Sequence, residues 1–108
     1  MSRIIGEEFK VIIDRPIGST HPDNDDVVYE VNYGYVEGII AADGEEQDAY
    51  VLGVDEPIKE YTGKLIAIIH RLNDVENKWV ISNRNYSKEE IYEQVKFVEK
   101  YFKVEILD

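Results

Sequence analysis

Residues 32–48 read NYGYVEGIIAADGEEQD and place an apolar strand directly before a strongly acidic turn. The apolar part covers residues 36–42, and Gly38 within it predicts a bulge or bend. The turn, residues 43–48, carries four carboxylates, which repel one another unless water or a cation screens them. Carboxylate oxygens suit a hard divalent cation such as Mg²⁺. The stretch therefore indicates a strand that ends in a candidate metal site.

The composition is typical of one soluble globular domain. Of the 108 residues, 44% are hydrophobic and 32% are charged, so a single domain covering residues 1–108 is expected. The chain has no cysteine, which excludes disulfides, thiolate metal sites and cysteine nucleophiles and favours a cytoplasmic location. No apolar run is long enough for a signal peptide or a membrane span.

The chain is strongly acidic. Its net charge is −11, from 12 Lys and Arg against 23 Asp and Glu. Such a surface repels nucleic acid and anionic membranes, so neither is expected as a partner. An anionic substrate would also be repelled unless metal ions invert the local field. The simpler interpretation, that the charge only keeps the protein soluble, stays open.

Short apolar segments at regular spacing predict that the first eighty or so residues are all β. The expected strands are residues 9–14, 27–31, 35–42, 49–54, 64–70 and 78–82. Residues 18–26 are dense in turn formers and acids, which predicts a solvated loop. Residues 73–77 are expected to form a turn that joins the last two strands into a hairpin. The pattern favours a small barrel or a sandwich.

The end of the chain changes to a helical period. Ser87 and Glu90 have the spacing of a capping box. Ile91, Val95, Val98 and Phe102 follow at steps of four, three and four, which places them on one helical face. Residues 103–107 are a candidate for a short final strand. The sequence thus predicts a mainly β (α+β) protein, a barrel with one C-terminal α-helix.

The segment Asn32-Tyr33-Gly34-Tyr35, followed by Asp43-Gly44-x-x-x-Asp48, resembles the core signature of family I soluble inorganic pyrophosphatases. In that family the acidic motif usually reads D-G-D-P-x-D between two apolar strands. The resemblance extends from residues 11–16 through the terminal helix. It implies a five-stranded OB-like barrel, inorganic diphosphate as the substrate, Mg²⁺ as the cofactor with Mn²⁺ as an alternative, and a homo-oligomer.

The resemblance assigns roles to the acidic turn by position. Asp43 and Asp48 match the outer metal ligands of the family motif. Glu45 stands where the family has a middle Asp, which orients or deprotonates the attacking water. Tyr33 matches an active-site tyrosine whose hydroxyl lies near the phosphate site. The extra methylene of Glu45 shifts the carboxylate that would act on the attacking water. The geometry of such a site must be held to within about 0.5 Å, so reduced activity is expected.

Two further parts of the family site have counterparts later in the chain. The family's second acidic loop matches residues 73–76, so Asp74 or Glu76 would supply further metal ligands. The family also has a Tyr-Lys pair on its last helix that binds a phosphate oxygen. Tyr101 and Lys103 correspond to that pair, with the lysine displaced by one position, which is about 100° round a helix.

The chain departs from the family in its cationic groups. The family has a longer insertion after the first strand that carries a Glu, a Lys and an Arg, whereas residues 18–26 contain no Lys or Arg. Losing one charge-stabilising group can reduce a rate by about 10²–10³. The candidate replacements are Arg15, His21, Lys64 and Arg71.

Three functions remain open. The first is a Mg²⁺-dependent inorganic pyrophosphatase, which the retained Asp43 and Asp48 favour. The second is a non-catalytic or weakly active module that binds metal or phosphate, which the missing cations favour. The third is a hydrolase for another phosphoanhydride, because a shortened loop would open the pocket. Asp43-Gly44 is also an ordinary hairpin turn, and Asp74 and Glu76 are also typical of plain turn acids.

Overall fold

The computed structural model describes residues 5–72 and 76–108. Its elements are β1 (Glu8–Arg15), β2 (Thr20–His21), β3 (Asn24–Val28), β4 (Asn32–Ile40), β5 (Glu46–Val51), β6 (Glu60–Arg71), β7 (Asn77–Ser82), α1 (Lys88–Glu99) and β8 (Val104–Leu107). Within these described ranges, no helix is long and apolar enough to cross a membrane.

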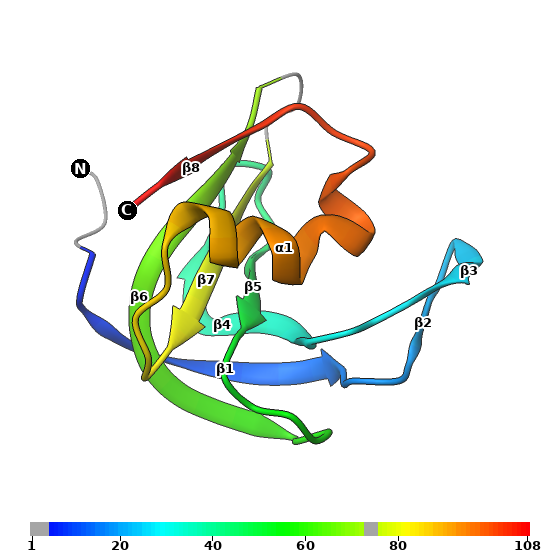
Figure 1. The fold of residues 1–108 in the computed structure, drawn as a ribbon. Helices are drawn as coiled ribbons and strands as arrows, with labels where there is room; N and C mark the ends of the chain where they lie inside the picture. The colour runs from blue at the N-terminus through cyan, green and yellow to red at the C-terminus, as the bar shows by residue number, and fades with distance from the viewer. Residues whose placement is uncertain (1–4, 73–75) are drawn as a thin grey trace.

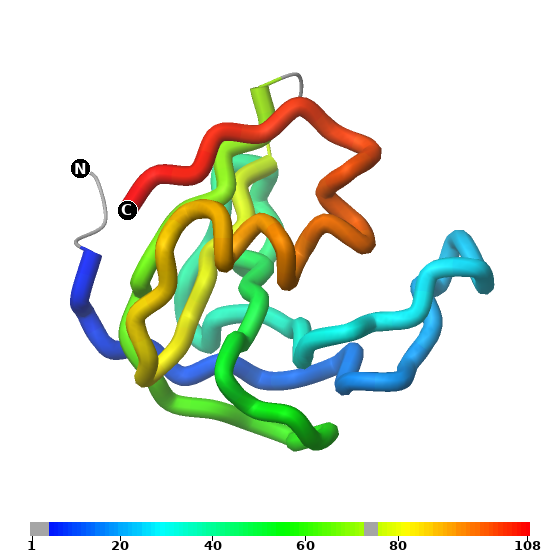
Figure 2. The backbone as a smooth tube through the Cα atoms, in the orientation of Figure 1, coloured from blue at the N-terminus to red at the C-terminus, as the bar shows by residue number. Residues whose placement is uncertain are grey.

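Five strands close into a barrel (Figure 1). The pairing runs β1–β4–β5–β7–β6 and returns from β6 to β1. The β5–β7 pair is parallel and the other barrel pairs are antiparallel. Strand β8 adds to β6 outside the barrel, and the β2–β3 hairpin projects from it (Figure 2). The predicted barrel with one C-terminal helix is confirmed.

Alternate residues of the barrel strands form two separate apolar clusters. On β5, Ala49 and Val51 belong to one cluster, whereas Tyr50 and the adjacent Leu52 belong to the other. This division follows from the two-residue period of a strand, which sends neighbouring side chains to opposite faces. Helix α1 covers the second cluster, and its Ile91 is fully buried there.

The capping box at the start of α1 is confirmed. The Glu90 amide donates to Ser87 Oγ over 3.1 Å, and the Ser87 amide donates to Glu90 Oε1 over 2.8 Å. The predicted extension of the helical stripe to Phe102 is wrong, because α1 ends at Glu99. The Phe102 amide bonds the Glu99 carbonyl three residues back, over 3.0 Å. Hydrogen bonds that span three residues instead of four are typical of the last turn of a helix. The chain then continues into β8, the predicted final strand.

The connection between β1 and β4 also differs from the prediction. Residues 18–26 were expected to be a loop, but most of them form the β2–β3 hairpin. The predicted strand 27–31 ends at Val28, because its partner β2 is only two residues long. Strand β4 begins at Asn32, earlier than predicted, because Asn32 pairs with Val51. The predicted bulge at Gly38 is confirmed by its φ of 82° and by a register shift between Tyr35 and Ile40.

Gly34 marks the closest approach of β4 to β1. A Cβ atom at this position would lie 1.8 Å from the Ile12 carbonyl oxygen. Gly34→Ala is therefore expected to lower the free energy of unfolding by about 3 kcal/mol, because the backbone of β1 must move. Urea denaturation would measure the change. The control Glu37→Ala lies exposed on the same strand and should stay within about 0.5 kcal/mol of the original protein. Equal midpoints for the two variants would contradict the close approach.

Candidate functional site

Charged side chains of both signs line a cavity of about 280 Å³ between the barrel, the β2–β3 hairpin and the C-terminal end of α1. The charged lining residues are Arg15, Asp23, Asp48, Arg71, Glu76 and Lys78. Tyr29, Tyr33 and Tyr50 also line the cavity, and a tyrosine hydroxyl can both donate and accept a hydrogen bond. The cavity therefore combines three cations with three carboxylates.

Lys78 contacts three other side chains that line the cavity. Its Nζ donates to Asp48 Oδ2 over 2.6 Å and to the Tyr33 hydroxyl over 2.8 Å, and it lies 3.3 Å from Glu76 Oε2. Strand register explains the meeting with Asp48: Ala49 on β5 pairs with Trp79 on β7, so the residues before them are neighbours on parallel strands. The Lys78 side chain is only 6% exposed. Its charge is thus fixed inside the pocket.

Arg71 is fixed by a buried carboxylate. Its Nε and Nη2 donate to the two oxygens of Glu99 over 3.0 and 2.7 Å, and Glu99 also accepts from the Tyr50 hydroxyl over 2.7 Å. Glu99 is fully buried. Burial opposes the charge of Arg71, but the Glu99 carboxylate outweighs it and raises the pKa of Arg71. The remaining nitrogen, Nη1, lies 3.2 Å from Glu76 Oε2 and faces the cavity.

Arg15 at the end of β1 provides the third cation. Its Nη1 donates to the Tyr29 hydroxyl over 2.8 Å, and its guanidinium lies 5.3 Å from the centre of the Tyr33 ring. His21 stacks on Tyr29 with 6.2 Å between ring centres and completes this side of the pocket. The aromatic rings therefore hold Arg15 at the wall of the cavity through cation–π contacts.

The tyrosines of the cavity keep their protons. Burial raises the pKa of Tyr33, and the nearby Asp48 carboxylate raises it further. Burial also raises the pKa of Tyr50, with Glu99 adding to the effect. The Tyr33 hydroxyl accepts from Lys78 and retains its own proton, so it can donate to an oxygen in the cavity.

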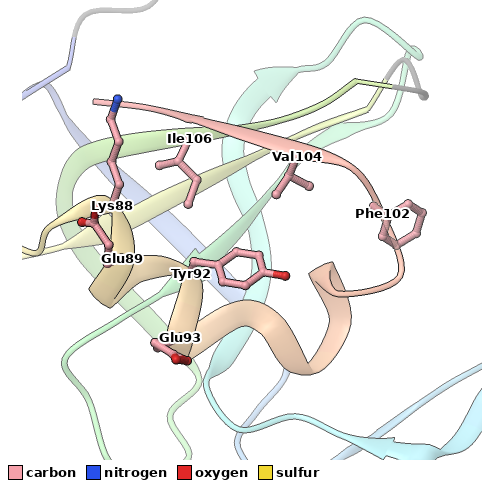
Figure 3. A pocket seen from close by; sticks show the side chains of 7 residues that line it. All are labelled: Lys88, Glu89, Tyr92, Glu93, Phe102, Val104 and Ile106. Atoms are coloured by element: carbon pink, nitrogen blue, oxygen red, sulfur yellow. The ribbon is translucent and has the colours of Figure 1, made fainter.

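A larger groove of about 620 Å³ lies between α1 and β8 (Figure 3). Tyr92 on the helix and Val104 and Ile106 on the strand form its apolar floor. Its charged residues are Lys88, Glu89 and Glu93. With two carboxylates against one ammonium, this groove is less suited to an anion than the Lys78 pocket.

Comparison of the whole chain with known proteins points to one fold. The structure of inorganic pyrophosphatase from Ehrlichia chaffeensis superposes with a TM-score of 0.71 at 15% identity, covering 96% of this chain and 86% of that one. This is the pyrophosphatase fold. The inorganic pyrophosphatase from Helicobacter pylori superposes with a TM-score of 0.68 at 16% identity, covering 100% of this chain and 90% of that one. The one from Coxiella burnetii superposes with a TM-score of 0.64 at 16% identity, covering 96% of this chain and 88% of that one. No protein-family model and no curated protein matches the sequence. The predicted OB-like barrel of the pyrophosphatase fold is therefore confirmed.

On this pyrophosphatase fold, the predicted metal ligands are only partly brought together. Asp48 and Glu76 meet at Lys78 and line the main cavity. Asp43 lines a neighbouring space of about 30 Å³ with both of them, and its Oδ1 accepts from the Glu45 amide over 3.0 Å. Glu45 lies exposed on the turn and lines neither space. The predicted ligand Asp74 lies outside the described residues.

The predicted phosphate-binding pair lies away from the cavity. Tyr101 is 63% exposed and Lys103 is exposed, and neither lines the Lys78 pocket. The expected displacement by one helical position does not apply, because α1 ends at Glu99 and both residues follow it. Among the predicted replacement cations, Arg15, His21 and Arg71 line the pocket, whereas Lys64 is exposed on β6.

Two residues of the site, Glu99 and Lys78, are not among the predicted site residues, although each has a local signal in the sequence. Glu99 lies one turn after Val95 on the apolar face that Ile91 begins, and a carboxylate on a buried helical face requires a partner. Lys78 lies between the second acidic turn and the apolar end of β7. A lysine at that boundary is compatible with either solvent or a buried ion pair, so its position alone did not decide its role.

Two carboxylates of the pocket, Asp48 and Glu76, offer the oxygen ligands that a divalent cation such as Mg²⁺ prefers. Asp48 and Glu76 converge on one positive centre, the Lys78 ammonium. In residues 5–72 and 76–108, no three His, Cys, Asp or Glu side chains are grouped so that they could hold a metal by themselves. Mg²⁺ is commonly held by one or two carboxylates together with substrate phosphates and water. Asp48 and Glu76 suit that arrangement.

Proposed function

We propose that this protein binds inorganic diphosphate in the Lys78 pocket and hydrolyses it to two phosphates with Mg²⁺ as cofactor. The observation that carries the proposal is the meeting of Asp48 and Glu76 at Lys78, in a cavity that Arg15 and Arg71 also line. The pyrophosphatase fold supports the same substrate class.

The side chains of the pocket suit the binding of a polyanion. Arg71 presents Nη1 to the cavity while Glu99 holds its other nitrogens, so little side-chain freedom is lost when it binds an anion. Arg15 is held by one hydrogen bond from its Nη1 to the Tyr29 hydroxyl. The protonated Tyr33 hydroxyl adds a neutral donor. Catalysis of phosphoryl transfer depends mainly on such positioning and charge neutralisation.

The carboxylates of the pocket complement these donors. Asp48 and Glu76 would hold Mg²⁺, which supplies charge neutralisation and lowers the pKa of bound water. Without such a cation, the two carboxylates would repel the diphosphate that the cations attract. The balance of three cations and three carboxylates therefore favours a ligand of mixed charge, such as diphosphate with its magnesium ion.

A second candidate function is binding without efficient turnover. Glu45, which would orient the attacking water, lies exposed outside the cavity. Tyr101 and Lys103 also lie away from the cavity, so two phosphate contacts of the family have no counterpart there. These placements favour a diphosphate-binding module of low activity.

Phosphate release separates the candidates. The purified protein is incubated with diphosphate or a nucleoside triphosphate, each with Mg²⁺ or with EDTA, and phosphate is measured colorimetrically. We expect Mg²⁺-dependent release from diphosphate and little from the nucleotide. Calorimetric binding of magnesium diphosphate without release would support the module instead. Faster release from the nucleotide would identify a hydrolase for another phosphoanhydride, and neither binding nor release would contradict the proposed function.

A further inference from the structure

We infer that the groove between α1 and β8 binds an extended, basic peptide segment of a partner protein, which adds a strand to the free edge of β8. Of the residues that line the groove, Phe102 is the one that also lines the Lys78 pocket. The inference therefore does not depend on the proposed function, and the two can be tested separately.

Strand β8 has an open edge. The strands β1, β4, β5, β7 and β6 close into a barrel, whereas β8 pairs with β6 alone among the described residues. Closing a sheet removes its edges, and an edge that stays open offers unpaired amides and carbonyls to another extended chain. The molecule therefore has a place where a partner can add a strand.

The register of β8 decides which of its backbone groups face the open edge. The Leu72 amide donates to the Lys103 carbonyl over 2.9 Å, so these two residues form a hydrogen-bonded antiparallel pair. Such pairs alternate along an antiparallel ladder, and Glu105 has the next bonded position on β8. The amides and carbonyls of Val104 and Ile106 therefore point away from β6, toward the open edge.

The groove offers side-chain contacts beside this edge. Val104 and Ile106 point from β8 toward Tyr92 on α1 (Figure 3). Together with Phe102, which precedes β8, they leave a space of about 620 Å³ unfilled. Side chains of an added strand recur on one face at every second position. Apolar residues at alternate positions of a bound peptide would therefore pack against this apolar floor.

The charges around the groove favour a basic occupant. Glu89 and Glu93 line its helical wall, and the one cation that lines it, Lys88, lies 3.7 Å from the Asp108 carboxylate. Lysine or arginine side chains of a partner would complement Glu89 and Glu93. A second copy of this chain, with its net charge of −11, would instead bring like charges together.

Selection from a peptide library provides the probe. Phage-displayed random peptides of about seven residues, long enough to extend past both ends of β8, are selected on the immobilised full chain. We expect the enriched sequences to carry apolar residues at alternate positions and at least one Lys or Arg. Enrichment of sequences without this pattern, or of none, would overturn the inference.

Amide hydrogen exchange, followed by NMR with a saturating synthetic copy of an enriched peptide, tests strand addition. We expect exchange at the amides of Val104 and Ile106 to slow at least about tenfold, because both gain an acceptor on the peptide. The amides of Glu105 and Leu107 bond to β6 and should change little. Binding that leaves Val104 and Ile106 unprotected would overturn the inference. Protection that rises with protein concentration without peptide would identify a second copy as the occupant, and would also overturn it.

Tyr92→Ala tests the helical wall of the groove. It should weaken peptide binding, measured by fluorescence anisotropy, at least about fivefold, because aromatic residues contribute strongly to interfaces. The control Tyr101→Ala removes the same side chain from an exposed position outside the groove and should leave the affinity unchanged. Circular dichroism confirms that both variants are folded. Equal affinities for the two variants would overturn the inference.

Glu89→Gln tests the charge of the groove. Removing this exposed carboxylate should weaken binding of the basic peptide about twofold to fivefold. The control Glu37→Gln makes the same change at an exposed position on β4, so both variants have the same net charge. An equal loss of affinity in the two variants would mean that the peptide responds to the overall charge and not to this groove, and would overturn the inference.

Discussion

Glu99→Ala is expected to lower the free energy of unfolding by about 3–5 kcal/mol, because it leaves the Arg71 guanidinium buried without its main partner. Glu99 accepts two hydrogen bonds from Arg71 and one from Tyr50, and it is the fully buried last residue of α1. The substitution also removes the hydrogen bonds that join the end of α1 to Tyr50 on β5 and Arg71 on β6. Chemical denaturation followed by circular dichroism measures the change.

A matched control lies on the same helix. Glu93 pairs with Lys96, but both side chains are more than half exposed. Glu93→Ala should therefore change the free energy of unfolding by about 1 kcal/mol or less. Equal changes in the free energy of unfolding for Glu99→Ala and Glu93→Ala would contradict a stabilising role of the buried Glu99 hydrogen bonds. Glu99→Gln separates charge from shape, because the amide retains the size of the side chain and loses its negative charge.

Asp48→Asn is expected to reduce phosphate release from magnesium diphosphate by about 10²–10³, the size of effect seen when one charge-stabilising group is lost. The amide keeps the shape of the side chain but removes the negative charge that pairs with Lys78. Because the Asp48 side chain is 37% exposed, the protein should remain folded. Colorimetric phosphate release at saturating Mg²⁺ gives the rate, and circular dichroism confirms the fold.

The control Asp43→Asn makes the same chemical change in the same acidic turn. Asp43 lies outside the main cavity and accepts a hydrogen bond from the Glu45 amide, which an asparagine oxygen can also accept. Its release rate should therefore stay closer to that of the original protein. Equal release by Asp48→Asn and the original protein would contradict the assignment of Asp48 to the reaction.

Local patterns in the sequence determined most of the secondary structure. The capping box at Ser87 and the bulge at Gly38 are each set by residues close in sequence. The resemblance across residues 32–48 predicted the barrel and the placement of Tyr33 and Asp48 in one site. The helical spacing of apolar residues, by contrast, placed Phe102 in the helix, and this was wrong, because the spacing continues past Glu99, where α1 ends.

The tertiary structure alone decided which charges form the pocket. The bonds Lys78–Tyr33, Arg71–Glu99 and Tyr50–Glu99 join residues 45, 28 and 49 positions apart. Their meeting depends on the parallel register of β5 and β7 and on where α1 packs, and neither is encoded in a local period. An isolated lysine or glutamate in a sequence is compatible with solvent or with a buried partner. Only the folded chain places Lys78 between two carboxylates and Glu99 behind Arg71, because burial makes such charges pair.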